Sequence, residues 1–234
     1  MSSFLENIEG FRGTGEVNEQ GLSLEEFLDK YNADKYPKPS VTADVLVFAY
    51  KKDTDNWFDD LQLLMIKRRN HPSIGYWALP GGFAEMREDL IDTAKRELEE
   101  ETGLTGIPLA QVYTYGEVER DPRDRVITAS YLAFVEQGTC KAKAGDDAKD
   151  AKWWDVKVEL VNTIRNGEVM EKEYQLCMHH QGEKELTAKV VEEVEMSSPL
   201  KIAQFRVRES NGIAFDHAKY IVEGYAYLDR RLNC

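Results

Sequence analysis

The chain has 234 residues, and its 43 acidic side chains outnumber its 30 basic ones to give a net charge of −13. A nucleic-acid surface needs clustered lysine and arginine to neutralise phosphates, so this balance argues against that class of partner. The length suits one large domain, or one domain with an elaboration. So acidic a chain is compatible with an anionic substrate only if a metal ion screens the site.

Cysteine usage and the first residues indicate the compartment. Cys140, Cys177 and Cys234 are far apart in the sequence and form no CxxC motif, which is typical of reduced thiols in a cytosolic protein. Residues 1–10 contain neither a basic stretch nor an apolar core, so we expect no secretion signal. No apolar run approaches the ~18–20 residues that span a bilayer. We therefore expect a cytoplasmic protein without a membrane partner.

Residues 1–40 are predicted to form an N-terminal arm with one short helix. Met1–Gly21 is polar and rich in glycine, which favours a loose conformation. Ser23 precedes an apolar run and Glu26 follows three residues later, the capping-box arrangement that begins a helix. The stretch Tyr31–Pro39, which contains tyrosines and prolines, ends this helix.

Residues 41–156 are predicted to form an α/β core. Val41–Tyr50 is apolar and rich in β-branched residues, which is typical of a buried strand. Further strands are predicted at Leu61–Ile66, Tyr76–Leu79, Leu109–Val118, Arg125–Val135 and Ala151–Val156. Together with one helix inside this region and another near the end of the chain, this order favours a mixed sheet with a helix on each face.

Residues 157–210 are predicted to form a β-rich insertion. Tyr174–Met178 and Leu186–Glu195 favour a hairpin, with Val158–Ile164 as a third strand and Lys201–Val207 as a further one. Because a lone hairpin is only marginally stable in water, we expect these strands to pack in a homodimer or over a substrate cleft.

Residues 211–234 are predicted to form a turn and a helix that packs on the core. Asn211 and Gly212 are typical of a turn, and Ala214–Leu232 carries apolar side chains at helical spacing. Asp216 is the expected N-cap of this helix.

The most informative stretch is residues 82–104, GFAEMREDLIDTAKRELEEETGL. From residue 89 to residue 101 it lacks glycine and proline and is rich in strong helix formers. Ile91, Ala94 and Leu98 recur at helical spacing and predict an apolar face. The stretch is therefore expected to contain an amphipathic helix.

A second face of this helix carries three carboxylates, because Glu97, Glu100 and Glu101 stand at i, i+3 and i+4. Like charges at this spacing repel one another, and the helix macrodipole disfavours anions near the C-terminus. Their placement therefore suggests a bound cation, and hard oxygen ligands suit Mg²⁺ or Mn²⁺ rather than zinc. The alternative is a solvated helix face in which Gly82 and Gly103 are ordinary loop and C-cap glycines.

The same stretch resembles the box of the Nudix hydrolases, G-x5-E-x7-R-E-U-x-E-E-x-G-U, where U is aliphatic. Every fixed and aliphatic position of that pattern is matched, by Gly82, Glu88, Arg96, Glu97, Leu98, Glu100, Glu101, Gly103 and Leu104. Tyr36–Thr42, Ala144–Ala148 and Ala214–Ala218 are similar to one branch of the family. That branch contains ADP-ribose pyrophosphatases, Nudix domains fused to nicotinamide-mononucleotide adenylyltransferases, and repressors of NAD metabolism.

The resemblance implies an α/β/α sandwich and hydrolysis of a nucleoside diphosphate linked to another moiety. It implies that Mg²⁺ or Mn²⁺ would be bound by one backbone carbonyl and three carboxylates, those of Gly81, Glu97, Glu100 and Glu101. Arg96 would orient these glutamates and belong with Glu97 and Glu100 to the catalytic set. Glu88 would anchor the junction between loop and helix, and is also within reach of a metal in this family.

The general base lies outside the box in this family. The resemblance points to the loop before a late strand, where Asp146 and Asp147 stand. The same two residues would also serve as an N-cap pair for a short turn of helix. Glu119 and Asp121, in the loop before residue 125, are the other candidates.

The resemblance also implies substrate contacts. Family members often carry an arginine after the second strand that is directed toward the substrate phosphate, and Arg68 has this place; a surface salt bridge would account for it as well. Arg125 is expected to do similar work. Tyr76 and Trp77 are candidates to stack on a base, although core packing is the favoured use of Trp77. His217 is interpreted as structural or exposed.

The function that the resemblance implies is Mg²⁺-dependent hydrolysis of ADP-ribose to AMP and ribose 5-phosphate. The alternatives are a pyrophosphatase for another nucleotide or nucleotide sugar, and a sensor of ADP-ribose-type ligands that regulates NAD metabolism. The related repressors carry a DNA-binding module after the Nudix domain. Because the sequence stops shortly after its last predicted helix, we expect that module to be missing. The expected partners are a nucleoside-diphosphate substrate and a second copy of the chain, without nucleic acid.

Overall fold

The computed structural model describes residues 4–145, 148–197, 199–200 and 202–233. These residues fall into two compact units, Met1–Lys38 and Pro39–Cys234. The first unit contains a short 3-10 helix, η1 (Glu9–Phe11), and the helix α1 (Leu24–Lys30). The Ser23 hydroxyl accepts a hydrogen bond from the Glu26 N–H, and the Glu26 carboxylate accepts one from the Ser23 N–H. The predicted capping box is therefore confirmed.

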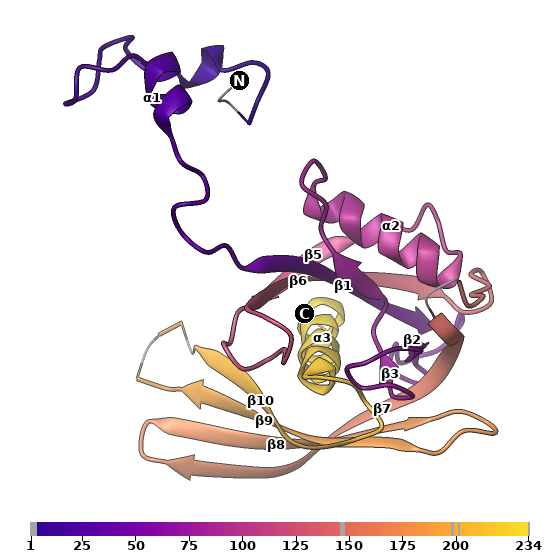
Figure 1. The fold of residues 1–234 in the computed structure, drawn as a ribbon. Helices are drawn as coiled ribbons and strands as arrows, with labels where there is room; N and C mark the ends of the chain where they lie inside the picture. The colour runs from indigo at the N-terminus through magenta and orange to yellow at the C-terminus, as the bar shows by residue number, and fades with distance from the viewer. Residues whose placement is uncertain (1–3, 146–147, 198, 201, 234) are drawn as a thin grey trace. The chain divides into compact units, whose positions relative to one another are not determined.

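The described part of the second unit contains one ten-stranded mixed sheet, shown in Figure 1. Its order is β10-β9-β8-β7-β2-β1-β6-β5, with β3 paired to β2 and β4 paired to β1. The strands are β1 (Ser40–Tyr50), β2 (Gln62–Arg68), β3 (Trp77–Ala78), β4 (Gly81–Phe83), β5 (Ala110–Tyr115), β6 (Val126–Glu136), β7 (Ala148–Asn166), β8 (Val169–His179), β9 (Leu186–Glu195) and β10 (Ala203–Asn211). The β1–β6 pair is parallel and the other strand pairs are antiparallel.

Two helices cover opposite faces of this sheet. On β1, Val45 and Val47 belong to the apolar cluster that contains Ala94 and Leu98 of α2 (Leu90–Thr102). The alternate residues of β1 belong to the cluster under α3 (His217–Leu232). Because successive side chains of a strand point to opposite faces, a strand between two helices must be apolar throughout. The predicted mixed sheet with a helix on each face is confirmed.

The predicted insertion continues the core sheet. Residues 151–156 and 158–164, expected as two strands, form the single 19-residue strand β7. At residue 157, where a break was expected, the strand continues, because Lys157 pairs regularly with Cys177 of β8; the register shifts only later, at a bulge between Leu160 and Asn162. Leu176, Val190 and Phe205, from β8, β9 and β10, share the apolar cluster of α3. Figure 1 shows the sheet curving around α3, so these strands bury their inner face within their own unit.

The ends of the two main helices differ in how well the sequence predicted them. Gly103 ends α2 with φ of 69°, the left-handed conformation expected of a C-cap glycine. Asp216 stands at the N-cap position of α3, as predicted, although its side chain makes no capping hydrogen bond. Its carboxylate accepts instead from Arg120 and Tyr220. Within the described residues, no helix combines the length and apolarity needed to cross a membrane.

Candidate active site

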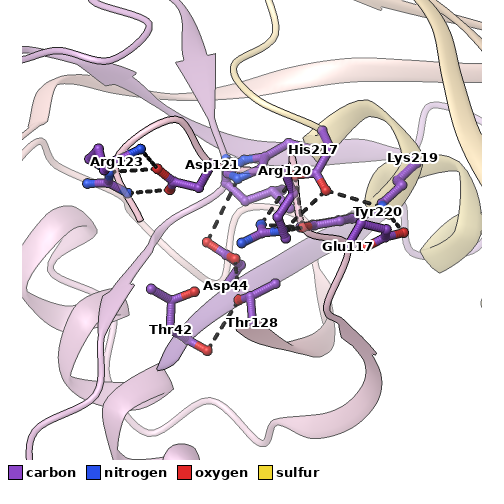
Figure 2. A network of polar contacts seen from close by, with 12 residues as sticks. Thr42, Asp44, Glu117, Arg120, Asp121, Arg123, Thr128, His217, Lys219 and Tyr220 are labelled. Carbon is purple, nitrogen blue, oxygen red and sulfur yellow. Dashed lines mark hydrogen bonds and ion pairs between the residues drawn. The ribbon is translucent and has the colours of Figure 1, made fainter. Parts of the chain in front are cut away.

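A cleft of about 300 Å³ opens where α2, the sheet and the turn before α3 meet. It is lined by Thr42 and Asp44 of β1, by Arg68, Leu79, Gly81, Gly82 and Phe83 around β2 to β4, by Glu97 and Glu101 of α2, by Arg120, Asp121 and Arg123 of the loop after β5, and by Phe215 and His217. Figure 2 shows the polar contacts that several of these residues make. Segments far apart in the sequence therefore contribute to one site.

Two glycines let the backbone of β4 approach the carboxylates of the cleft. Gly81 has φ of 155°, and a Cβ there would lie 2.3 Å from the Ala43 carbonyl oxygen. A Cβ on Gly82 would lie 2.4 Å from the carboxyl carbon of Glu97. Backbone atoms exclude a side chain at position 81, whereas a side chain at position 82 would displace the Glu97 carboxylate, so close approach explains the glycine pair.

Glu101 is the most deeply buried carboxylate of the box helix, with 9% of its surface exposed. Its Oε2 accepts a hydrogen bond of 2.9 Å from the Gly81 N–H. Burial raises the pKa of Glu101 to about 8, and the negative charges of Glu97 and Asp44 act in the same direction. Burial also raises the pKa of Glu97, although Arg96 opposes it. The acidic side of the cleft thus holds carboxylates whose charges are not fully compensated.

Arg96 connects the box helix to the loop that precedes it. Its guanidinium donates to Glu88 (2.8 Å), to Glu97 (2.7 Å), to Glu100 (3.2 Å) and to the Phe83 carbonyl (3.0 Å). The hydrogen bonds from Arg96 lower the pKa of Glu88 to about 2. The Glu100 side chain is 58% exposed and does not line the cleft. Arg96 therefore fixes Glu97 at the edge of the site and holds Glu100 outside it.

Oxygen donors dominate the acidic side of the cleft, and they suit a hard divalent cation such as Mg²⁺ or Mn²⁺. Glu97, Glu101 and Asp44 line it together with the Gly81 backbone. Mutual repulsion among these carboxylates would be relieved by a bound cation. Within the described ranges, however, no three His, Cys, Asp or Glu side chains are grouped closely enough to hold a metal ion. The chemistry of these donors therefore fits the expected Mg²⁺ or Mn²⁺. Arg96 meanwhile binds the carboxylates of Glu97 and Glu100 by hydrogen bonds.

Arg68, at the end of β2, forms the basic side of the cleft together with Arg120 and Arg123. Its Nε donates to the Pro72 carbonyl at 2.8 Å, and its guanidinium lies 4.9 Å from the centre of the Phe215 ring. Burial, followed by the charge of Arg123, lowers its pKa. In the part of the chain that the structure describes, Arg68 forms no ion pair, so the alternative of a surface salt bridge is not realised.

Arg123 and Arg120 reach the cleft from the loop between β5 and β6, and sequence reasoning missed both. Arg123 donates twice to Asp121, at 3.0 and 2.7 Å. Burial alone would raise the pKa of Asp121, but these hydrogen bonds lower it overall, so Asp121 is poorly suited to take a proton. Arg120 is held by Asp216 and by the Tyr220 hydroxyl.

The loop that carries these arginines is fastened to α3, as Figure 2 shows. Lys219 donates to Glu117 at 2.6 Å, and the Tyr220 ring stacks on Tyr115 with 3.8 Å between centroids. Arg125 donates to the carbonyl oxygens of residues 116 and 117 and does not line the cleft. Arg125 thus stabilises the backbone of this loop by hydrogen bonds and does not face the cleft.

Several other expected site residues lie outside the cleft. Tyr76 is 46% exposed and does not line it, while Trp77 is 3% exposed and packs edge-on against Trp154, as the core-packing interpretation expected. Glu119 is exposed and is also not among the lining residues. Asp146 and Asp147 lie outside the residues that the structure describes.

His217 and Asp44 are buried polar residues at the floor of the cleft. The His217 Nδ1 accepts from the Leu79 N–H at 3.0 Å, and its Nε2 lies 3.9 Å from an Asp44 oxygen. Burial lowers the pKa of His217, so the ring is neutral and structural. Asp44 accepts from the Thr128 hydroxyl at 2.5 Å. A carboxylate directly before the apolar run of residues 45–49, within the predicted buried strand, was the one sequence signal that pointed to Asp44.

Comparisons with known proteins agree with this geometry. The model of the NUDIX domain matches residues 38–172. The chain is 38% identical over 115 residues to the ADPR responsive transcriptional repressor NtrR of Acinetobacter baylyi, across 48% of this chain and 44% of the repressor. It is 38% identical over 129 residues to an ADP-ribose pyrophosphatase of Methanocaldococcus jannaschii, across 55% of this chain and 68% of that protein. The match thus spans less than half of the repressor's length.

Two solved structures extend the likeness to the fold. A MutT/nudix family protein from Enterococcus faecalis is 30% identical, with a TM-score of 0.63, across 97% of this chain and 75% of that one. The NUDIX domain of Shewanella oneidensis NrtR, solved with ADP ribose, is 30% identical, with a TM-score of 0.50, across 57% of this chain and 84% of that one. Because the family model covers more than half of the residues and the box is complete, the chain belongs to the NUDIX domain family.

Proposed function

We propose that this protein hydrolyses a nucleoside diphosphate linked to another moiety, and that its substrate is ADP-ribose, which is cut to AMP and ribose 5-phosphate. The observation that carries the proposal is the two-sided cleft, in which Glu97 and Glu101 share one cavity with Arg68. A diphosphate needs both sides, because it is anionic and is hydrolysed with a divalent cation. The likeness to an ADP-ribose pyrophosphatase supports the choice of substrate.

The chain's own residues would divide the work as follows. A Mg²⁺ or Mn²⁺ ion held by Gly81, Glu97 and Glu101, and by Glu100 once its side chain leaves Arg96 and turns into the cleft, would supply charge neutralisation and an activated water. Arg68 would bind a phosphate oxygen of the substrate, because its guanidinium is half-buried in the cleft without an ion pair in the described residues. Arg96 would hold Glu97 in place.

Hydrolysis adds water across the P–O–P linkage, so one P–O bond forms and another breaks. The proton of the attacking water needs a carboxylate acceptor. Asp146 or Asp147, which directly precede β7 in the sequence, is our proposed acceptor. Asp121 is disfavoured by its bidentate contact with Arg123.

The same proposal includes a homodimer in the cytoplasm, without a nucleic-acid partner. Leu160, Val161 and Ile164 on the far half of β7 are about half exposed, and an interface between two copies would cover them. Light scattering on the purified chain is expected to give twice the mass of one copy. A monomer at micromolar concentration would contradict this part of the proposal.

A substrate panel tests the activity. Purified protein with Mg²⁺ is given ADP-ribose, a nucleoside triphosphate, a dinucleoside polyphosphate and 8-oxo-dGDP, and the products are resolved by chromatography. We expect AMP and ribose 5-phosphate from ADP-ribose, with kcat/KM above that for the other compounds. Glu97→Gln is expected to lose most of this turnover while it keeps the wild-type melting temperature. Inertness of the wild type toward the whole panel, with Mg²⁺ or Mn²⁺ supplied, would refute the proposal.

A second candidate is a sensor that binds ADP-ribose without cleaving it, and the similarity to NtrR favours it. The two candidates differ in turnover alone. If calorimetry detects ADP-ribose binding and the sugar nucleotide stays intact after prolonged incubation with Mg²⁺, the sensor is the better description.

A further inference from the structure

The basic side of the cleft is built on one aromatic ring. The guanidinium of Arg68 lies 4.9 Å from the centre of the Phe215 ring, and that of Arg123 lies 5.7 Å from it. Arg123 is also 5.1 Å from the ring of Phe83, which is 43% exposed. Two like charges beside one ring repel each other, so the arrangement persists only because other contacts hold both arginines.

Phe215 itself has an uncommon backbone conformation. Its φ of 49° lies in the left-handed region, which a bulky side chain rarely adopts. Nearby residues before and after it are fixed: the Ala214 N–H donates to the Trp77 carbonyl at 2.8 Å, and the ring of His217, two residues later, accepts from the Leu79 N–H. Asparagine or glycine would suit this φ better. A phenyl ring at this position therefore calls for a role beyond the turn.

Each arginine is oriented by contacts that leave part of its fork available. Arg68 uses its Nε on the Pro72 carbonyl, and Arg123 uses Nε and Nη2 on Asp121. A guanidinium that stacks on a ring keeps its N–H groups in its own plane, where they match the oxygens of a phosphate. Among the described contacts, the remaining nitrogens of Arg68 have no protein acceptor.

We propose that Phe215 is a positioning residue that holds Arg68 and Arg123 side by side as one anion subsite, which binds the substrate phosphate in the cleft that Glu97 and Glu101 also line. The inference rests on the proposed function and deepens it, because it assigns Arg123 and Phe215 to substrate binding. It also explains why the ring is kept where the backbone favours a smaller residue.

Metal-free binding of inorganic pyrophosphate tests the subsite without turnover. Calorimetry in EDTA compares wild type with Phe215→Leu, Phe215→Tyr, Arg68→Met, Arg123→Met and the double arginine variant, and Arg165→Met serves as an exposed control. We expect Phe215→Leu to weaken binding about tenfold, whereas Phe215→Tyr, which keeps the ring, and Arg165→Met bind like wild type. The double arginine variant should lose clearly less affinity than the product of the two single losses, because both arginines would share one phosphate.

Steady-state kinetics with ADP-ribose and Mg²⁺ separates positioning from a general structural role. Phe215→Leu should raise KM about tenfold and change kcat less than threefold, and Phe215→Tyr should restore the wild-type KM. The inference would be overturned, even if ADP-ribose is hydrolysed, by either of two results. One is a pyrophosphate affinity of Phe215→Leu equal to that of wild type. The other is an affinity loss of the double arginine variant equal to the product of the two single losses. If Phe215→Leu does not fold, the pyrophosphate affinities of the two single arginine variants, the double arginine variant and Phe215→Tyr decide whether the inference holds. Ring-dependent pyrophosphate binding without any turnover would instead refute the proposed function and leave the subsite standing.

Discussion

Replacing Glu101 by glutamine should stabilise the metal-free protein at alkaline pH while it abolishes activity. Glu101 is buried, and its pKa rises from 4.5 to about 8 because burial penalises the charged carboxylate. A folded-state pKa above the unfolded value gives stability that is complete below pH 4.5 and is lost as the pH rises through 8. Glutamine resembles the protonated form and keeps an oxygen that can accept from the Gly81 N–H. Glu101→Gln therefore keeps the stability that the wild type loses when Glu101 ionises at alkaline pH.

The size of the effect follows from the same two pKa values. The interval from 4.5 to about 8 corresponds to about 5 kcal/mol, since each tenfold change in proton affinity is worth about 1.4 kcal/mol. Relaxation of the site reduces this upper bound, so we expect about 2–5 kcal/mol above pH 8 and almost no difference at pH 4.5.

Urea denaturation in EDTA at pH 5 and pH 9 measures the difference. Glu100→Gln is the matched control, because that side chain is 58% exposed, and it should change the free energy of unfolding by less than about 1 kcal/mol at both pH values. Mg²⁺ at pH 9 should raise the unfolding midpoint of the wild type by mass action, and that of Glu101→Gln much less. A Glu101→Gln variant no more stable than wild type at pH 9 would refute the assignment of a strained, buried carboxylate.

Two further substitutions probe the surroundings of this carboxylate. Gly82→Ala places a Cβ 2.4 Å from the Glu97 carboxyl, so kcat should fall about 100-fold through misplacement of Glu97, and circular dichroism should show an intact fold; wild-type turnover would contradict the close approach. Arg96→Met removes the hydrogen bonds to Glu88 and Glu97, so urea denaturation at pH 7 should show a loss of about 1–3 kcal/mol. Because Arg96 lowers the pKa of Glu88 to about 2, its stabilisation is present above pH 4.5 and lost as the pH falls through 2. A deficit that is independent of pH between 7 and 2 would argue against this origin.

The sequence predicted the acidic half of the site better than the basic half. Glu97 and Glu101 belong to one contiguous motif and Gly81 directly precedes it, so helical spacing and the resemblance could find them. Arg123 and Phe215 stand in loops 92 residues apart in the sequence, and no local pattern relates them. Arg125 was the expected arginine of its loop, yet its donors face backbone carbonyls.

The sequence alone indicated most of the strands, the two helices that cover the sheet, the buried strand β1 and the carboxylate motif of α2, because these depend on periodicity and on contacts between near neighbours. Only the tertiary structure decided which loop arginines reach the cleft, that Glu100 turns away from it toward Arg96, and that the strands after β7 enclose α3. These features depend on contacts between residues distant in the chain, and such contacts are set by the packing of the whole sheet around its helices.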